Sequence, residues 1–402
     1  MEHPTRARGL TMTLFPGIDL SAIGPACASS GADGWLLYDF RGLNPVAKRV
    51  VGAHGMGTRR LFIWLPVDGQ PVAIAHRIEL QGIEGFPGEI RPYATWRELH
   101  ELLGQVVSGR TVAMEVSPDD AVPYLDRVPA GVVELIKRLG GAVVPSSGLV
   151  SRFAATWSSD ELEDHRAAAE TIAEIARHTI RQVVGQVGAA REASVQRKVL
   201  DAMDRAGLTT DHPPIVAFGA NAANPHYEPR EGADAELKQD DVVLLDLWGG
   251  KTMHAVFADQ TWMGFAGSTP PDEVMRVWTT TRDARDAVVR HLEEAAAHHR
   301  TIVGADLDDV ARRLIADAGY GDAFVHRTGH SIDCELHGSG PNLDNFETND
   351  QRELIPGIGF SVEPGIYLEG RFGVRSEINV FLHEDRPEVT PANPQQDMIL
   401  AG

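Results

Sequence analysis

Four strand-like segments in the second half of the chain each carry one carboxylate inside an otherwise apolar run. They are DVVLLDLWGG with Asp246, AVFADQTWMGF with Asp259, GFSVEPGIYL with Glu363 and GVRSEINVFL with Glu377. An ionised carboxylate in a buried strand costs several kcal/mol unless it is paired or binds a metal. A single example fits an outward-facing position on a half-exposed strand, but four examples favour one shared site.

The spacing of these carboxylates allows the first two, and likewise the last two, to lie on adjacent strands joined by a short connection. Two similar hairpins would then face each other across the site. Few basic residues lie near them in the sequence, chiefly Lys251 and Arg375. Because two divalent cations would balance four negative charges, the pattern indicates a site for two metal ions.

The segment FVHRTGHSIDCELHGSG adds three histidines, His326, His330 and His337. Their spacing alone leaves a metal ligand, a proton-handling cluster and ordinary core histidines open. Oxygen-rich ligation with one imidazole suits manganese, cobalt or zinc. Two such ions about 3.5–4 Å apart can hold a bridging hydroxide as nucleophile and polarise a carbonyl. The hypothesis is therefore hydrolysis of an acyl bond.

This set of residues resembles the metallopeptidase family of prolidase, aminopeptidase P, methionine aminopeptidase and creatinase, whose catalytic domain has the pita-bread fold. The resemblance implies two divalent metal ions per chain, with manganese first and zinc or cobalt as alternatives. By position, the implied metal ligands are Asp246, Asp259, His330 in TGHSID, Glu363 in VEPG and Glu377 in VRSE.

The resemblance also implies roles beyond ligation. Glu363 is expected to move the proton between water and the leaving nitrogen, and His337 and His226, in NPHYEP, to stabilise the tetrahedral intermediate. His326 is expected to line the substrate site. Arg375 is expected beside the substrate, where it would orient the ligands.

The chain departs from the family pattern around the site. The turn between the two aspartates is longer, and the usual GHGIG appears as GHSID. Val256, Trp262 and Gly338 stand where relatives often have tyrosine, arginine and an acidic residue. No departure removes an implied ligand, so these changes bear on the shape of the substrate pocket.

The length of 402 residues predicts two domains. The fold expected is an α/β creatinase-like N-terminal domain over 1–155 and an α+β pita-bread catalytic domain over 156–402. Within the first domain, Asp68-Gly69 predicts a hairpin turn. Ser158 and Glu161 have the spacing of a capping box that opens a long helix.

The leading function is an Xaa-Pro dipeptidase, a prolidase. Such an enzyme needs a cation for the free carboxylate beyond proline, and the candidates are Arg41, Arg49, Arg59 and Arg60, with Arg41 preferred. The alternatives are an Xaa-Pro aminopeptidase that acts on longer peptides and a non-catalytic pita-bread binding protein. Methionine aminopeptidase is disfavoured by the large N-terminal domain, and creatinase by the intact ligand set.

Composition limits the classes of binding partner and the cellular location that are expected. A formal net charge of −20 disfavours nucleic acid. No apolar run is long enough to span a bilayer, and the N-terminal residues lack the apolar stretch of a secretory signal. Two distant cysteines, Cys27 and Cys334, fit a reducing compartment. The expectation is a cytoplasmic protein with a small peptide substrate, no membrane partner and, from the family, a homodimer.

Overall fold

The computed structural model describes residues 20–52 and 57–402, which divide after Ala154 into two compact units. We call them the N-terminal unit and the C-terminal unit. The expectation about a secretory signal concerns residues that lie outside the described ranges. Within those ranges, no helix combines the length and apolar character needed to cross a membrane.

The N-terminal unit is a mixed sheet with helices on both faces. Its strands follow the order β4-β3-β2-β1-β5-β6, with antiparallel pairs β1–β2 and β2–β3 and parallel pairs elsewhere. The strands are β1 (Gly34–Phe40), β2 (Arg60–Pro66), β3 (Val72–His76), β4 (Glu89–Tyr93), β5 (Thr111–Met114) and β6 (Ala142–Pro145). The helices are α1 (Leu20–Ser29), α2 (Pro45–Val51), α3 (Trp96–Val107), α4 (Ala130–Arg138) and α5 (Ser147–Phe153), with 3-10 turns η1 (Leu80–Ile83), η2 (Pro118–Asp120) and η3 (Pro123–Leu125).

Alternation along β1 explains why this sheet is covered on both sides. Trp35 and Leu37 pack into one apolar cluster, whereas Leu36 and Tyr38 pack into the cluster on the other face. The predicted turn at Asp68-Gly69 is confirmed, because β2 and β3 pair across it and Gly69 has a φ of 103°. Glycine reaches that region without steric cost.

The C-terminal unit contains the elements from α6 to β16, which are arranged in layers. Its helices are α6 (Ser159–Val183), α7 (Glu192–Arg205), α8 (Asp272–Ala297) and α9 (Gly304–Asp317), with 3-10 turns η4 (Gly219–Ala223) and η5 (Gly321–Ala323). Its strands are β7 (Ile215–Phe218), β8 (Val242–Gly249), β9 (Ala258–Phe265), β10 (Ser331–Ile332), β11 (Gly359–Val362), β12 (Gly365–Leu368), β13 (Phe372–Arg375), β14 (Ile378–Leu382), β15 (Pro387–Thr390) and β16 (Ile399–Leu400). They form sheets in the orders β16-β9-β8-β7, β10-β11-β14-β15 and β12-β13.

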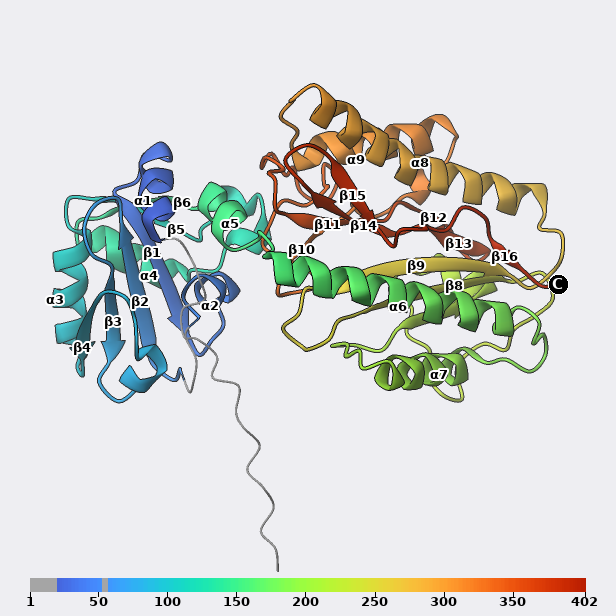
Figure 1. Ribbon diagram of the computed structural model, residues 1–402, viewed down its shortest axis with the longest axis horizontal. Coiled ribbons are helices and arrows are strands. Elements are labelled where there is room, and N and C mark those ends of the chain that lie inside the picture. Colours follow the sequence, from blue (N-terminus) through green and yellow to red (C-terminus); the bar gives the residue numbers. More distant parts are fainter. Residues whose placement is uncertain (1–19, 53–56) are drawn as a thin grey trace, which may run out of the picture. The chain divides into compact units, whose positions relative to one another are not determined.

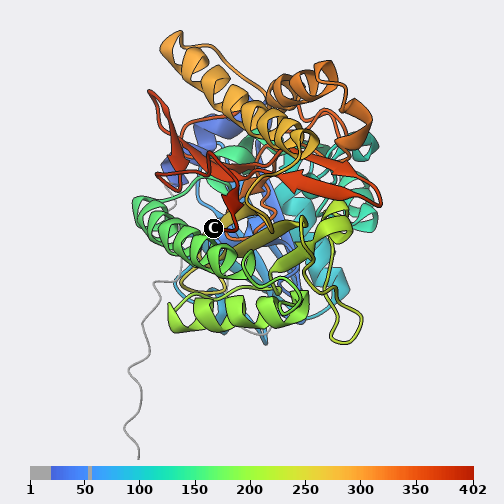
Figure 2. The same cartoon turned by 90° about the vertical axis from the view of Figure 1, so that its right-hand side faces the viewer.

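Two pairs of helices enclose these sheets. Figures 1 and 2 show α6 and α7 along β8 and β9, and α8 and α9 on the opposite side of the unit. The predicted capping box is confirmed: Ser158 Oγ accepts the Glu161 amide, and Glu161 accepts the Ser158 amide. These two bonds satisfy backbone donors that the first turn of α6 would otherwise leave unpaired.

Strand β8 determines where the carboxylates can lie. Val243, Leu245 and Leu247 face the cluster formed with α6 and α7. Leu244 belongs to the cluster on the other face, which also includes residues of α8 and of β11 to β14. Because side chains alternate along a strand, Asp246 shares the face of Leu244, toward the second layer. Together, the two units have the architecture that was expected, an α/β N-terminal domain followed by a pita-bread domain.

Candidate metal centre

Neighbouring strands supply the four carboxylates. Asp246 lies on β8 and Asp259 on β9, which pair antiparallel over their full length. Glu363 directly follows β11, and Glu377 stands between β13 and β14. Since β11 pairs with β14, and β12 with β13, the expectation of two adjacent-strand arrangements is met by the pairing.

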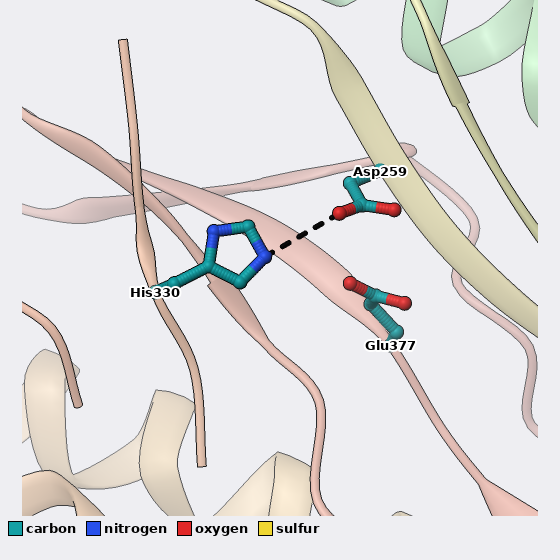
Figure 3. A group of neighbouring side chains, drawn as sticks. All are labelled: Asp259, His330 and Glu377. Atoms are coloured by element: carbon teal, nitrogen blue, oxygen red, sulfur yellow. Dashed lines mark ion pairs between the residues drawn. The ribbon is translucent and has the colours of Figure 1, made fainter. Parts of the chain in front are cut away.

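Three side chains form the tightest group. Ligand atoms of Asp259, His330 and Glu377 all lie within 4.8 Å of one another, and all three side chains are buried. Figure 3 shows both carboxylates turned toward the imidazole ring. His330 Nε2 is 3.4 Å from Asp259 Oδ2 and also 3.4 Å from Glu363 Oε1. The group therefore extends from three side chains to four.

His330 is held so that Nε2 faces this group. Its Nδ1 lies 3.1 Å from the carbonyl oxygen of Ser331, and its backbone amide donates to Ser361 Oγ at 2.9 Å. The same hydroxyl donates to Glu363 Oε1 at 3.1 Å. A proton on Nδ1 bonds the carbonyl and leaves the Nε2 lone pair for a metal. Burial lowers the pKa of His330 to about 4, which keeps the ring neutral.

Asp246 joins the group through Arg375. The buried guanidinium forms an ion pair with Asp246 Oδ2 and donates from Nε to Thr261 Oγ1 at 2.7 Å. Thr261 in turn donates to Glu377 Oε2 at 2.7 Å. Arg375 thus contacts carboxylates of the expected ligand set rather than an open surface, which agrees with the orienting part of its expected role.

The protein's own groups do not keep all four carboxylates ionised at this site. Burial raises the pKa of Asp246 to about 7, although Arg375 opposes that shift. Burial and neighbouring carboxylates likewise raise the pKa values of Asp259 and Glu377 well above their usual range. At Glu363 burial also disfavours the charge, but His330 and Arg375 outweigh it and bring the pKa to about 2.

The residues present fit bound divalent cations. Asp246 Oδ1 is buried and has no hydrogen-bond partner among the described residues, an arrangement that costs free energy unless a ligand completes it. The donor set is four carboxylates and one neutral imidazole, which suits hard to borderline metals. Cations would give every carboxylate a partner and remove the repulsion that raises their pKa values.

Two further histidines lie beside the group. The ring of His337 stands edge-on to that of His330, with 4.4 Å between centroids. His330 and desolvation lower the pKa of His337 to about 3, and His226 contributes to the shift, although His337 retains an exposed surface. The side chain of His226 is exposed, on the segment that follows η4.

His326 occupies a different environment. Its Nε2 lies 2.8 Å from the Tyr367 hydroxyl, and its Nδ1 lies 2.7 Å from the carbonyl oxygen of Arg327. Both ring nitrogens of His326 therefore have hydrogen-bond partners within the protein.

Comparison with known proteins agrees with this geometry. Residues 163–384 match Metallopeptidase family M24. The chain belongs to this family. It is 37% identical over 170 residues to an Xaa-Pro dipeptidase of Lactobacillus delbrueckii subsp. lactis, covering 42% of each chain. It is 27% identical over 343 residues to a probable dipeptidase PepE of Mycobacterium bovis, covering 84% of each. The implied family membership is confirmed, and the chain is an M24 metallopeptidase.

Solved structures support the fold of this M24 peptidase. Dipeptidase PepE from Mycobacterium ulcerans superposes with a TM-score of 0.74 at 22% identity, over 95% of this chain and 96% of that one. A prolidase from Thermococcus sibiricus gives a TM-score of 0.69 at 24% identity, over 96% and 100%. Both cover the two units described above.

Sequence reasoning missed several residues that contact the expected ligands or the histidines beside them. Thr261 shares a strand face with Asp259 two positions earlier, so alternation could have found it. Asn379 Oδ1 accepts the Asp259 amide at 2.9 Å, and Tyr367 bonds His326, but neither has a sequence signal of its own. Arg41 lies exposed in the N-terminal unit with a φ of 65°, and its reach to the site stays a prediction.

Proposed function

We propose that this chain is an Xaa-Pro dipeptidase, which hydrolyses the bond between an N-terminal residue and proline. The observation that carries the proposal is the convergence of Asp259, His330 and Glu377, with Glu363 at 3.4 Å from the imidazole. The similarity to an Xaa-Pro dipeptidase supports the choice of substrate class.

The five proposed ligands are Asp246, Asp259, His330, Glu363 and Glu377. They would hold two divalent ions, manganese foremost, with zinc or cobalt as alternatives. When bound, such ions supply polarisation of the scissile carbonyl and activation of a water molecule. Four of these side chains are buried and Glu363 is 13% exposed, so little bulk water reaches the site and each charge interaction in it is strengthened.

The remaining steps belong to side chains of the protein. Glu363 Oε1 takes the proton of the attacking water and passes it to the proline nitrogen as that group leaves. His337 and His226 donate hydrogen bonds to the oxygen on which negative charge develops. His326, fixed by Tyr367, contacts the substrate, and Arg375 keeps Asp246 and Thr261 in place.

Preference for dipeptides rests on Arg41. A dipeptide ends in a carboxylate just beyond proline, and a guanidinium there would bind it while a longer peptide would lack that charge. The remaining proposals are a homodimer and a cytoplasmic location, both of which follow the family resemblance and the composition.

The test is a metal-reconstituted assay. Protein stripped with a chelator is restored separately with manganese, cobalt or zinc, and release of the first residue is measured from Ala-Pro and from Ala-Pro-Ala. We expect metal-dependent cleavage with faster turnover of the dipeptide, and loss of at least about 100-fold in Glu363→Gln. Faster cleavage of the tripeptide would assign an Xaa-Pro aminopeptidase instead. If the protein binds two metal ions and still cleaves neither peptide, the proposal is contradicted and a binding protein is favoured.

A further inference from the structure

Trp248 occupies a position beside the metal centre to which no role has yet been assigned. It follows Asp246 by two residues on β8, so the two side chains lie on the same face. Its cross-strand partner on β9 is Asp259. Directly opposite residues of an antiparallel pair have Cβ atoms about 4.5–5.5 Å apart, so the indole begins next to a proposed ligand.

The indole is only partly buried. It packs on the same apolar cluster as Leu244 and Tyr227 and leaves part of its surface open. In contrast, Asp246 and Asp259 at its sides are 5% exposed each. Trp248 therefore lies at the edge of the centre and exposes part of a large, flat apolar side chain to solvent.

Asp211 fixes the orientation of this ring. The indole Nε1 donates to Asp211 Oδ1 at 2.6 Å. The segment that carries Asp211 is tied to the end of β8, because Thr209 and Gly250 exchange backbone hydrogen bonds of 2.8 and 3.0 Å. Two anchors thus hold the ring, which favours a preorganised surface over a mobile one.

Asp211 also places negative charge on this side of the centre. Its side chain is 36% exposed, and its other oxygen lies 3.3 Å from His212 Nδ1 on the surface. Asp211 accepts the bond from the indole whose cross-strand partner is Asp259, so it lies on the side of the centre that Trp248 borders. This side of the centre therefore carries a negative charge.

A peptide substrate that is cut after its first residue presents a positive charge that matches the carboxylate of Asp211. Its ammonium group belongs to the first residue, and the carboxylate of a dipeptide lies beyond the second. We propose that Trp248 and Asp211 form the subsite for the N-terminal residue, with the indole against its apolar side chain and the carboxylate beside its ammonium group. This inference rests on the proposed exopeptidase function, which it deepens.

The first experiment varies the side chain. Trp248→Ala and wild type, both loaded with manganese, are compared on Leu-Pro and Gly-Pro. We expect kcat/KM for Leu-Pro to fall about tenfold and that for Gly-Pro to change less than about twofold, since only the leucine side chain reaches the indole. Trp248→Phe, which keeps a flat apolar surface, should recover most of the loss. Trp96→Ala, at an exposed tryptophan of the N-terminal unit, is the matched control.

The second experiment varies the charge. Asp211→Asn keeps an acceptor for the indole but removes the negative charge. We expect KM for Leu-Pro to rise about five- to tenfold with little change in kcat, and no rise for N-formyl-Leu-Pro, which lacks the ammonium group. Asp201→Asn, on the exposed face of α7, is the control. Equal losses on both substrates would overturn the assignment of Asp211.

Binding of the free product separates this inference from the proposed function. Calorimetric titration of L-leucine and glycine into manganese-loaded protein needs no cleavage. Weaker leucine binding in Trp248→Ala, with glycine and metal content unchanged, supports the subsite even if wild type cleaves no Xaa-Pro bond. Leucine binding that is unchanged in Trp248→Ala would overturn the subsite even if wild type is an active prolidase.

Discussion

At the scale of single residues, Arg375 decides how the carboxylates are presented. It pairs with Asp246, bonds Thr261, and lies with Nε 3.9 Å from Glu377 Oε2. A planar guanidinium can serve two acceptors in fixed directions, whereas an ammonium group offers a single point charge. The geometry of the site therefore depends on the shape of this cation as well as on its charge.

We expect Arg375→Lys to lower kcat/KM at least about tenfold, because lysine retains the charge but cannot hold Asp246 and Thr261 together. Steady-state kinetics with manganese, together with metal content by mass spectrometry, provides the measurement. Arg371→Lys is the control, since Arg371 forms an exposed ion pair with Glu273 outside the centre. Equal activity of the two variants would show that orientation by Arg375 is not needed.

Sequence reasoning found the carboxylates because a charge in an apolar strand is a local signal. Asp246 and Asp259 could be recognised this way, and the ligand role proposed for His330 followed from the resemblance. Asn379 could not, since neutral polar residues in strands are common, and Thr261 could be found only through its alternation with Asp259 on the same strand. The partnership of Trp248 with Asp211 joins β8 to the segment before β7, and only tertiary structure brings these together.

At the scale of elements, Glu115 joins several parts of the N-terminal unit. It follows β5, is fully buried, and accepts hydrogen bonds from Trp35 Nε1 on β1 at 2.6 Å and from Ser146 Oγ, before α5, at 3.1 Å. It also accepts from Asn44 Nδ2 at 2.9 Å, and Asn44 caps α2. Burial nevertheless outweighs these donors and raises the pKa of Glu115 from 4.5 to about 6.

This shift predicts how stability depends on pH. A raised pKa means that the folded state holds its proton more tightly, so stability from this group is lost as pH rises from about 4.5 to 6. On lowering pH from about 7 to about 5, we expect the free energy of unfolding to rise by about 1 kcal/mol from this group. The measurement is urea unfolding of wild type and of Glu115→Gln at several pH values. The rise should be missing in the variant, because glutamine cannot titrate. Parallel pH profiles for the two proteins would contradict the assignment.

At the scale of the whole molecule, the two units differ in what they need to fold. The sheet of the N-terminal unit is covered by apolar clusters on both faces. The C-terminal unit buries Asp246, Asp259 and Glu377 between its layers and leaves Glu363 13% exposed, and desolvation opposes charge on each of them. Cations that bind the folded centre should therefore stabilise the C-terminal unit selectively.

Hydrogen exchange with mass spectrometry can localise this effect. In protein freed of metal by a chelator, we expect peptides from β8, β9, β11 and β14 to exchange faster than in manganese-loaded protein. Peptides from β1, β2 and β5 should exchange equally in both, because they belong to the other unit. Asp259→Asn is the control, since it removes a proposed ligand and should abolish the protection that manganese adds. Protection that is spread evenly over both units would mean that metal binding stabilises them as a single cooperative block, whereas protection confined to the C-terminal strands would locate the cations between its layers.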